Sequence, residues 1–414
     1  MQTQLAPEYQ NTADGEAAQA ILRKCVHCGF CTATCPTYQL LGDELDGPRG
    51  RIYLMKQVLE GQAPTRATQT HLDRCLTCRN CESTCPSGVE YGHLLDIGRK
   101  LVDAKVPRPL GERAVRWALK EGLPSPLFGP AMQLGQMVRP LLPSSLKNKV
   151  PARQDAGRWP SSTHGRKVLM LAGCAQPSMA PNINSATARV LDAAGISVVV
   201  PESAGCCGAV KFHLNDQAGG LDHMRANIDA WWPHIDPQAP GSTGVEAIVM
   251  NASGCGVTVK DYGHLLHADP AYAAKAARVS ALCKDLSELL PGLVPSLQAR
   301  VQAAGAPRLV FHPPCTLQHG QKLRGGVETH MAALGFAVRV AASESYLCCG
   351  SAGTYSVLNP DLAYQLRDRK LGHLAAQADE VIISANIGCI THLQSGSSTP
   401  VKHWVEVLDA ALAG

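Results

Sequence analysis

The sequence has few aromatic residues, little net charge and no long apolar run. Phe, Trp and Tyr make up 5% of the 414 residues, and no basic patch interleaves with them, which argues against nucleic-acid binding. The formal net charge is only +4, with charges of both signs dispersed along the chain. No apolar stretch approaches the ~20 residues that a membrane-spanning helix needs. We therefore expect a globular protein with neither a nucleic-acid partner nor a transmembrane helix.

Two further signals are missing. The opening residues MQTQLAPEYQ contain no basic segment followed by an apolar one, so we expect no export signal and expect the 17 cysteines to stay reduced. Reduced cysteines in such number indicate metal binding or redox chemistry. No G-x-G-x-x-G follows a strand, so no flavin site is expected in this chain. No arrangement of Ser, His and Asp suggests nucleophilic catalysis, and we predict no catalytic residue.

One cysteine pattern, C-x₂-C-x₂-C-x₃-C-P, occurs twice near the start of the chain, and it is typical of loops that hold [4Fe–4S] clusters. The fourth cysteine of such a run usually ligates the other cluster. The predicted ligands of cluster one are Cys25, Cys28, Cys31 and Cys85. The predicted ligands of cluster two are Cys75, Cys78, Cys81 and Cys35. Structural zinc is the alternative, but zinc sites typically use two separated cysteine pairs.

The stretch between the two cysteine runs favours a helical ferredoxin over a compact β-rich one. Its apolar residues recur at helical spacing, as Ile52, Met55 and Leu59 illustrate. Several basic residues lie near the loops in sequence: Lys24, Arg49, Arg51, Arg74 and Arg79. Positive charge near a cluster raises its potential, although ordinary solvated charge is an equally good interpretation of each residue.

A boundary follows this first part. Residues 123–143 are apolar but interrupted by prolines and by Arg139, which predicts a poor helix. This segment is either a linker packed on the protein's own surface, which we favour, or a contact with a membrane or a partner subunit. Residues 143–166 are rich in Ser, Pro and basic residues, as linkers are. We predict an α-helical ferredoxin at 1–110, a connecting segment at 111–165, and cysteine-rich domains at 166–300 and 301–414.

The second half of the chain contains an internal repeat, because two sets of cysteines recur at a nearly constant offset. The first set is Cys174, Cys206, Cys207 and Cys255. The second set is Cys315, Cys348, Cys349 and Cys389. In each set the paired cysteines are followed by a glycine, Gly208 or Gly350, which permits a positive φ.

Short apolar strands precede the cysteines of both repeats. The first repeat contains KVLMLA, ISVVV and AIVMNA, and the second contains RLVFH, FAVRV and EVIISA. A helical pattern at 182–194 ends at Gly195, a favourable residue after a helix. Strands alternating with helices predict duplicated α/β domains with parallel sheets. The thiols then lie at the carboxyl ends of strands, where such sheets bind ligands.

The eight repeat cysteines allow several interpretations. Adjacent thiols suit an irregular iron–sulfur cluster, which we favour over a zinc site, a redox dithiol or buried structural cysteines. Cys283 matches nothing in the repeat and lies in a helix-like stretch, which favours a packed core thiol. His312 and His392 are candidates for ligands or for donors to ligands, and structural roles are at least as probable. For Trp231 and Trp232 we favour a role in helix packing or in an interface over a role as an electron relay.

These motifs together carry a family resemblance. Two C-x₂-C-x₂-C-x₃-C-P runs followed by two Cys-Cys-Gly domains resemble the iron–sulfur subunits of flavin-linked respiratory dehydrogenases and of heterodisulfide reductase. DGPRGRIYLMK at 46–56 and the segments around GCCG and CCGSAGTYS bring the chain nearest to the glycolate oxidase iron–sulfur subunits. The resemblance covers nearly the whole chain. One departure is that Cys255 and Cys389 stand alone, whereas heterodisulfide reductase repeats end in C-x-x-C, so each repeat offers four thiols rather than five.

The resemblance implies an electron-transfer subunit of a multisubunit 2-hydroxy-acid dehydrogenase. A partner flavoprotein with FAD would oxidise glycolate to glyoxylate, and two [4Fe–4S] clusters here, with a further iron–sulfur cluster or zinc in the Cys-Cys-Gly domains, would pass electrons toward a quinone. It also implies peripheral attachment to the cytoplasmic side of the bacterial inner membrane. The alternatives are the corresponding subunit of anaerobic glycerol-3-phosphate dehydrogenase or of a lactate-utilisation complex, or a catalytic subunit like that of heterodisulfide reductase.

Overall fold

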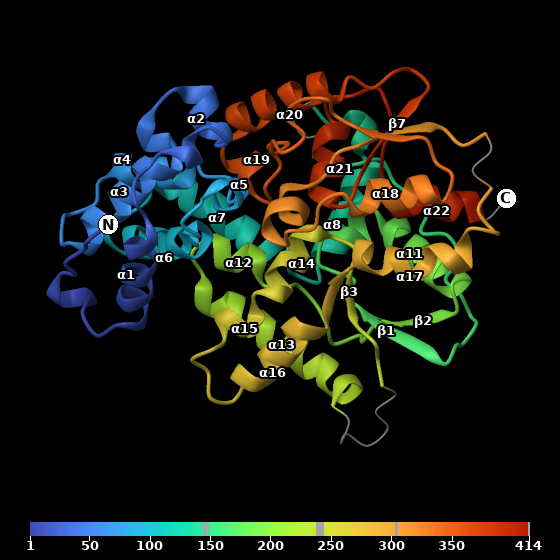
Figure 1. Cartoon of the computed structure of the whole chain (residues 1–414), viewed down its shortest axis with the longest axis horizontal. Coiled ribbons are helices and arrows are strands. Elements are labelled where there is room, and N and C mark those ends of the chain that lie inside the picture. Colours follow the sequence, from blue (N-terminus) through green and yellow to red (C-terminus); the bar gives the residue numbers. More distant parts are fainter. Residues whose placement is uncertain (144–146, 148, 237–243, 303–304, 413–414) are drawn as a thin grey trace. The chain divides into compact units, whose positions relative to one another are not determined.

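The computed structural model describes residues 1–143, 147, 149–236, 244–302 and 305–412 (Figure 1). The chain divides into two compact units. The first comprises Met1–Trp117 and Tyr346–Leu366, and the second comprises Ala118–Ser345 and Arg367–Gly414. The four segments expected from the sequence, and the three boundaries between them, stay a prediction.

The first unit is helical, and none of its residues, all of which are described, forms a strand. Its helices are α1 (Ala13–Lys24), α2 (Pro36–Leu41), α3 (Pro48–Leu59), α4 (Arg66–Asp73), α5 (Asn80–Thr84), α6 (Tyr91–Lys105), the start of α7 (Leu110–Gly122), α19 (Tyr355–Leu358) and the start of α20 (Pro360–Leu374). Short 3₁₀ turns at Pro7–Tyr9, Phe30–Thr32 and Glu44–Asp46 link them. The expected helical ferredoxin is therefore confirmed.

Local sequence explains where these helices begin and how they pack. Pro48 occupies the first turn of α3, where a missing N–H costs no hydrogen bond. Thr65 caps α4 by accepting a hydrogen bond from the N–H of Thr68, which bonds back in a capping box. The apolar face of α3 is buried through residues such as Met55 and Leu59, which lie in one core with the cluster loops.

The second unit contains two parallel four-stranded sheets with the same strand order, β2-β1-β3-β4 and β6-β5-β7-β8. The first sheet comprises β1 (Arg166–Met170), β2 (Ile196–Val199), β3 (Ile248–Met250) and β4 (Cys283–Asp285). The second comprises β5 (Arg308–Phe311), β6 (Val338–Val340), β7 (Glu380–Ser384) and β8 (Val401–His403). All pairings are parallel. The predicted duplicated α/β architecture is confirmed.

Helices connect and cover these strands. They are α8 (Phe128–Met137), α10 (Gln176–Met179), α11 (Pro181–Ala193), α12 (Ala209–His213), α13 (Gln217–Ile235), α14 (Ser253–Lys260), α15 (Tyr262–Leu265), α16 (Ala273–Leu282), α17 (Leu290–Leu297), α18 (Gly326–Ala333), the greater part of α20, α21 (Ile387–Gln394) and α22 (Trp404–Leu412). Short turns are η4 (Arg139–Leu141), η5 (Leu286–Leu289) and η6 (Thr316–Gly320). The predicted helix at 182–194 is confirmed as α11, and Gly195 after it has φ +76°.

Two expectations about secondary structure were wrong. Cys283 begins strand β4 instead of lying in a helix, because α16 ends at Leu282 and the chain then pairs with β3. The segment 123–143 contains a regular helix, α8, because Pro130 falls in its first turn and the other prolines lie outside it. Among the described residues, no helix is both long and apolar enough to cross a membrane.

The two repeats are joined directly inside the second unit. Ser253 at the start of α14 donates its N–H to the carbonyl oxygen of Ala385 (3.0 Å), and its hydroxyl lies 2.7 Å from that of Thr316. On α11 of the first repeat, Arg189 forms an ion pair with Asp409 on α22 of the second, at 2.6 Å. The carboxyl ends of β3 and β7 are thus held next to each other.

Candidate metal centres

The two cysteine loops of the first unit share one unusual backbone conformation. Two residues of each loop have positive φ: His27 (+59°) and Gly29 (+86°) in the first, and Thr77 (+54°) and Arg79 (+59°) in the second. These residues occupy equivalent positions between the cysteines. Left-handed backbone is costly for residues other than glycine, so it persists where the surroundings require it. Here it folds each run of three cysteines back on itself so that the thiols converge.

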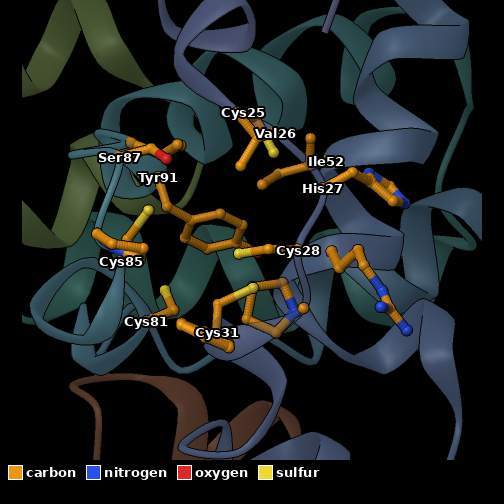
Figure 2. A pocket seen from close by; sticks show the side chains of 16 residues that line it. Cys25, Val26, His27, Cys28, Cys31, Ile52, Cys81, Cys85, Ser87 and Tyr91 are labelled. Atoms are coloured by element: carbon orange, nitrogen blue, oxygen red, sulfur yellow. The ribbon is translucent and has the colours of Figure 1, made fainter.

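A cavity lies beside the first cysteine loop, and residues of the second run also line it. Its lining includes the thiols Cys25, Cys28, Cys31, Cys81 and Cys85. Figure 2 shows these side chains grouped around the ring of Tyr91. The four cysteines expected to bind cluster one therefore line a single cavity, together with one cysteine assigned to the other cluster.

The thiols fall into two groups according to which neighbouring thiols raise their pKa values. Burial raises the pKa of Cys31 to about 11, and the nearby thiols Cys25, Cys85 and Cys28 add to that rise. These four are the predicted ligands of cluster one. Three thiols from one loop and a fourth from the other run are the donor set that a [4Fe–4S] cluster requires.

The second group contains three thiols of the second run and one of the first. Burial raises the pKa of Cys81 well above its usual value, and the neighbouring Cys78, Cys75, Glu82 and Cys35 raise it further. Three of these neighbours are the remaining predicted ligands of cluster two. In each group the fourth cysteine comes from the opposite run, so the thiols fit two clusters with crossed ligands.

Hydrogen bonds from the protein point at the thiols of the second group. The N–H of Thr77 donates to Cys75 Sγ (3.4 Å), and the hydroxyl of Tyr91 lies 3.8 Å from the same sulfur. The hydroxyl of Thr37 lies 3.4 Å from Cys35 Sγ. Hydrogen bonds to ligating sulfurs stabilise the reduced, more negative form of a cluster and so raise its potential.

A buried arginine lies beside this second group. Arg51 donates to the carbonyl oxygen of His71 (2.7 Å) and to Thr37 Oγ1 (3.1 Å), and its Nη2 is 3.3 Å from Asp46 Oδ1. Arg74 also pairs with Asp46, at 2.9 Å. Of the five basic residues considered from the sequence, Arg51 is therefore no solvated charge but part of a buried network.

The charge of Arg51 is stabilised by its surroundings. Burial alone would lower the pKa of this guanidinium, but the neighbouring Cys75, Tyr91, Cys35 and Asp46 outweigh it, so the pKa is raised. Two of these neighbours are predicted ligands of cluster two, so Arg51 places a permanent positive charge near that predicted ligand set. This is the arrangement expected to raise the potential of that cluster.

Arg99 was not identified from the sequence. It projects from α6 and donates to the carbonyl oxygens of Leu72 (2.8 Å) and Cys75 (2.7 Å) and to Thr77 Oγ1 (3.2 Å). It thereby fixes the backbone of the second cysteine loop. An arginine in a helix well beyond the motif carries no local signal of this role, which only the fold reveals.

The first repeat of the second unit brings its four cysteines together. Hydrogen bonds from Cys174 and Cys207 lower the pKa of Cys206, whereas the same bonds raise the pKa of Cys174 and of Cys207. A hydrogen bond with Cys255 also raises the pKa of Cys207. The four sulfurs thus lie close enough to interact with one another, a donor set that fits a metal group with several sulfur ligands.

The loop that carries Cys206 and Cys207 is built to hold them. Gly208 has φ +91°, and an added Cβ there would lie 2.6 Å from the carbonyl oxygen of Gly220 in α13, so glycine is required. Tyr262 donates its hydroxyl to the carbonyl oxygen of Cys207 (2.9 Å), and Asn227 donates to that of Cys206 (2.8 Å).

The second repeat distributes its cysteines over both compact units. Cys315 and Cys389 are buried in the second unit, where Asn386 Nδ2 lies 3.7 Å from Cys389 Sγ. Cys348 and Cys349 are buried in the Tyr346–Leu366 segment of the first unit.

The glycine of this turn matches that of the first repeat. Gly350 has φ +88°, and an added Cβ would lie 2.4 Å from the carbonyl oxygen of Ala363. Both Cys-Cys-Gly turns therefore require glycine for the same reason, a left-handed conformation pressed against a helix carbonyl.

Three of the remaining candidates, Cys283, Trp231 and Trp232, are explained by packing. Cys283 is 4% exposed in the core of the first repeat, and Trp231 is fully buried there and stacks on Tyr262 with ring centroids 6.5 Å apart. Trp232 donates to Asp236 at 3.1 Å. Burial, aided by nearby Lys370, lowers the pKa of His312 well below its usual value, so its imidazole is neutral.

Comparison with known proteins agrees with this domain order. Residues 21–89 match the model of the 4Fe–4S dicluster domain, and residues 168–260 and 309–394 match that of the cysteine-rich domain. The chain is 56% identical to the glycolate oxidase iron–sulfur subunit of Escherichia coli (strain K12), over 100% of this chain and 99% of the relative.

More distant relatives match as well. The chain is 30% identical to the probable glycolate oxidase iron–sulfur subunit of Bacillus subtilis (strain 168), over 94% of this chain and 92% of that protein. It is 25% identical to lactate utilization protein A of Geobacillus kaustophilus, over 59% of this chain and 99% of the relative. The resemblance inferred from the motifs is confirmed, and the chain belongs to the family of glycolate oxidase iron–sulfur subunits.

Proposed function

We propose that this chain is the electron-transfer subunit of a glycolate dehydrogenase complex in which a flavoprotein partner, carrying FAD, oxidises glycolate to glyoxylate. The observation that carries the proposal is the crossed grouping of the thiols: Cys35 neighbours Cys81 of the second loop, and Cys85 neighbours Cys31 of the first. Crossed ligands hold two clusters close together, as stepwise electron transfer needs. The full-length similarity to the Escherichia coli protein supports glycolate as the electron source.

The residues of this chain have defined roles in the proposal. Cys25, Cys28, Cys31 and Cys85 would hold one cluster. Cys75, Cys78, Cys81 and Cys35 would hold the other. Bound clusters supply one-electron redox chemistry, and the protein supplies their ligands, their burial and their electrostatic surroundings. Arg99 donates to the backbone of the second loop, and Arg51 places positive charge near the predicted ligands of cluster two.

The cysteine-rich repeats would hold further metal. Cys174, Cys206, Cys207 and Cys255 offer one set of thiols, and Cys315, Cys348, Cys349 and Cys389 offer the other. The mutual hydrogen bonds in the first set support a shared ligand role, because isolated structural thiols have no need to gather in one place. An iron–sulfur cluster is the favoured occupant, and zinc is the alternative.

We further propose that the complex delivers electrons to a quinone from the cytoplasmic side of the inner membrane, with this chain attached peripherally. Exposed apolar side chains between the two halves of the sequence support this attachment. Leu127, Leu134, Met137 and Leu141 are 75%, 58%, 67% and 86% exposed. Co-flotation of the complex with lipid vesicles tests it. Loss of flotation in a double variant, Leu134→Glu with Met137→Glu, is the expected result, and unchanged flotation contradicts this surface as the membrane contact.

The function is tested by electron paramagnetic resonance on the natively purified complex. Glycolate, lactate and glycerol 3-phosphate are added separately under anaerobic conditions. We expect glycolate to reduce the clusters, and a Cys35→Ser variant, which removes one ligand of cluster two, to lose that cluster's signal. Reduction only by lactate or by glycerol 3-phosphate would move the chain to a neighbouring dehydrogenase. No reduction by any of them, with clusters that still respond to dithionite, would favour disulfide reduction.

A further inference from the structure

We propose that His312 is a nitrogen ligand to iron, in a metal group that it shares with Cys389 of the second cysteine-rich repeat. The inference rests on the proposal that this repeat binds an iron–sulfur cluster. It goes further by adding an imidazole to the thiols and by giving the two repeats different donor sets. None of the eight repeat cysteines is replaced in this scheme.

The backbone holds His312 at the carboxyl end of the central strand pair. The residue follows the last residue of β5, and its N–H donates to the carbonyl oxygen of Ile383 in β7 at 2.8 Å. Its own carbonyl oxygen accepts from the hydroxyl of Ser384 at 3.0 Å. Both bonds tie it to β7, the strand that leads into Cys389. Ligands bind at this end of parallel sheets.

The side chain is fully buried and lacks any polar partner. His312 is 0% exposed, and neither Nδ1 nor Nε2 has a hydrogen-bond partner among the described residues. A buried, unsatisfied polar group costs about 1–3 kcal/mol, so native proteins rarely keep one without a reason. A ring nitrogen of His312 and the sulfur of Cys389 lie within 4.8 Å of each other, which is close enough for both to bind one metal centre.

The same position in the first repeat is not a donor. Leu171 follows β1 directly and precedes Cys174 by three residues, as His312 precedes Cys315. Leu171 is 3% exposed and apolar. The first site therefore offers thiols alone, whereas the second offers thiols and an imidazole.

Another buried histidine of the same sheet provides a contrast. His403 in β8 is 1% exposed, but its Nδ1 accepts a hydrogen bond from the N–H of Val405 at 3.1 Å. It therefore has a structural role in starting α22. His312 has no such bond from either nitrogen, so burial in the sheet does not by itself explain it.

An imidazole ligand changes what the second site does. A neutral imidazole adds a nitrogen donor to the thiols without adding negative charge. Because ligand identity is one of the properties that set the potential of an iron–sulfur centre, the sites of the two repeats should differ in reduction potential.

The experiment uses the full chain, purified anaerobically, with histidine labelled with nitrogen-15. The N-terminal clusters are first disrupted by Cys28→Ser and Cys78→Ser, so that the remaining iron signal comes from the second unit. Electron–nuclear double resonance on that signal should detect a histidine nitrogen bound directly to iron. His312→Ala should abolish that coupling and the associated iron. The matched control, His403→Ala, removes an equally buried imidazole and should leave both unchanged. The measurement of the coupling in the labelled wild-type chain does not depend on the folding of any variant.

Several outcomes would overturn the inference. No histidine coupling, or a coupling that survives in His312→Gln, would leave His312 as a buried bystander. Zinc in the second repeat would rule out iron there. Iron confined to the N-terminal clusters would also refute it, yet reduction of those clusters by glycolate would still support the electron-transfer function. Failure of the two proposals is therefore distinguishable.

Discussion

Replacing Arg51 with methionine tests whether a buried cation supports the second cluster loop. The substitution keeps the volume of an unbranched side chain and removes the charge and the hydrogen bonds. Arg51 and Asp46 are each 1% exposed, so the change leaves the Asp46 carboxylate buried with less compensation. The bonds to Thr37 Oγ1 and to the carbonyl oxygen of His71 are lost as well.

The expected cost follows from this burial. Removing one partner of a buried ion pair typically destabilises a protein by about 3–5 kcal/mol. Arg74 still pairs with Asp46 at 2.9 Å, which places the loss toward the lower end of that range. The reduction potential of cluster two should fall at the same time, because a positive charge near predicted ligands Cys75 and Cys35 disappears.

Arg49 provides a matched control two residues away. It pairs with Glu44 at 2.6 Å, but the side chains are 33% and 41% exposed. A pair this exposed contributes at most about 1 kcal/mol. Denaturant unfolding of the cluster-loaded protein under anaerobic conditions gives the stability of each variant. Potentiometric titration followed by electron paramagnetic resonance gives the potentials of the clusters.

Equal losses of unfolding free energy in Arg49→Met and Arg51→Met would refute the reasoning, because burial of the ion pair would then not determine how much stability is lost. An unchanged potential for cluster two in Arg51→Met, at normal iron content, would separate the structural role from the electrostatic one. In that case Arg51 would serve only to hold together the buried network of Thr37, Asp46 and His71.

Three further predictions concern backbone conformation and pH. Gly208→Ala should lower the free energy of unfolding by at least about 2 kcal/mol and release metal from the first repeat, because the added Cβ meets a helix carbonyl oxygen. The control is Gly195→Ala, where φ is +76° but the space around the residue is open, and it should cost only the ~1–2 kcal/mol of left-handed strain. Thermal unfolding and iron content measure both effects. His27→Val should destabilise the protein by about 1 kcal/mol and His27→Gly should not, since φ there is +59°; equal losses in thermal scans would contradict the role of strain. Burial would raise the pKa of Asp73, but the hydrogen bond from Arg108 and nearby positive charges outweigh it, so the pKa is lowered. The ionised Asp73 therefore stabilises the folded protein at pH values above its unfolded pKa near 4, and this stabilisation is lost as the pH falls through its folded pKa. Asp73→Asn should make the free energy of unfolding depend less on pH on the acid side.

The cysteine spacing allowed much of the site to be predicted. A ligand set can be inferred from local spacing when three thiols come from one loop, as with Cys25, Cys28 and Cys31. The repeated Cys-Cys-Gly turns likewise predicted left-handed glycines, which Gly208 and Gly350 adopt. These features are encoded within a few residues of each other, so no tertiary information is needed to see them.

Other features could not be predicted because they depend on distant parts of the chain. Arg99 reaches the second loop from α6, and nothing near it in sequence indicates a partner. Strands β4 and β8 are short and contain a central lysine, Lys284 or Lys402, so they lack the apolar run by which the other strands were recognised. Helix α8 differs from the expectation because a proline count does not distinguish Pro130, in the first turn where a helix tolerates proline, from prolines that would break it.

The direct bonding between the two repeats joins corresponding parts of them. Ser253 follows β3 and Ala385 follows β7, and these are the third strands in sequence of their sheets. Two copies of one architecture in a single chain need not stay identical, because a substitution in one copy leaves the other unchanged. Leucine at 171 and histidine at 312 are such a difference, at corresponding positions of the two repeats.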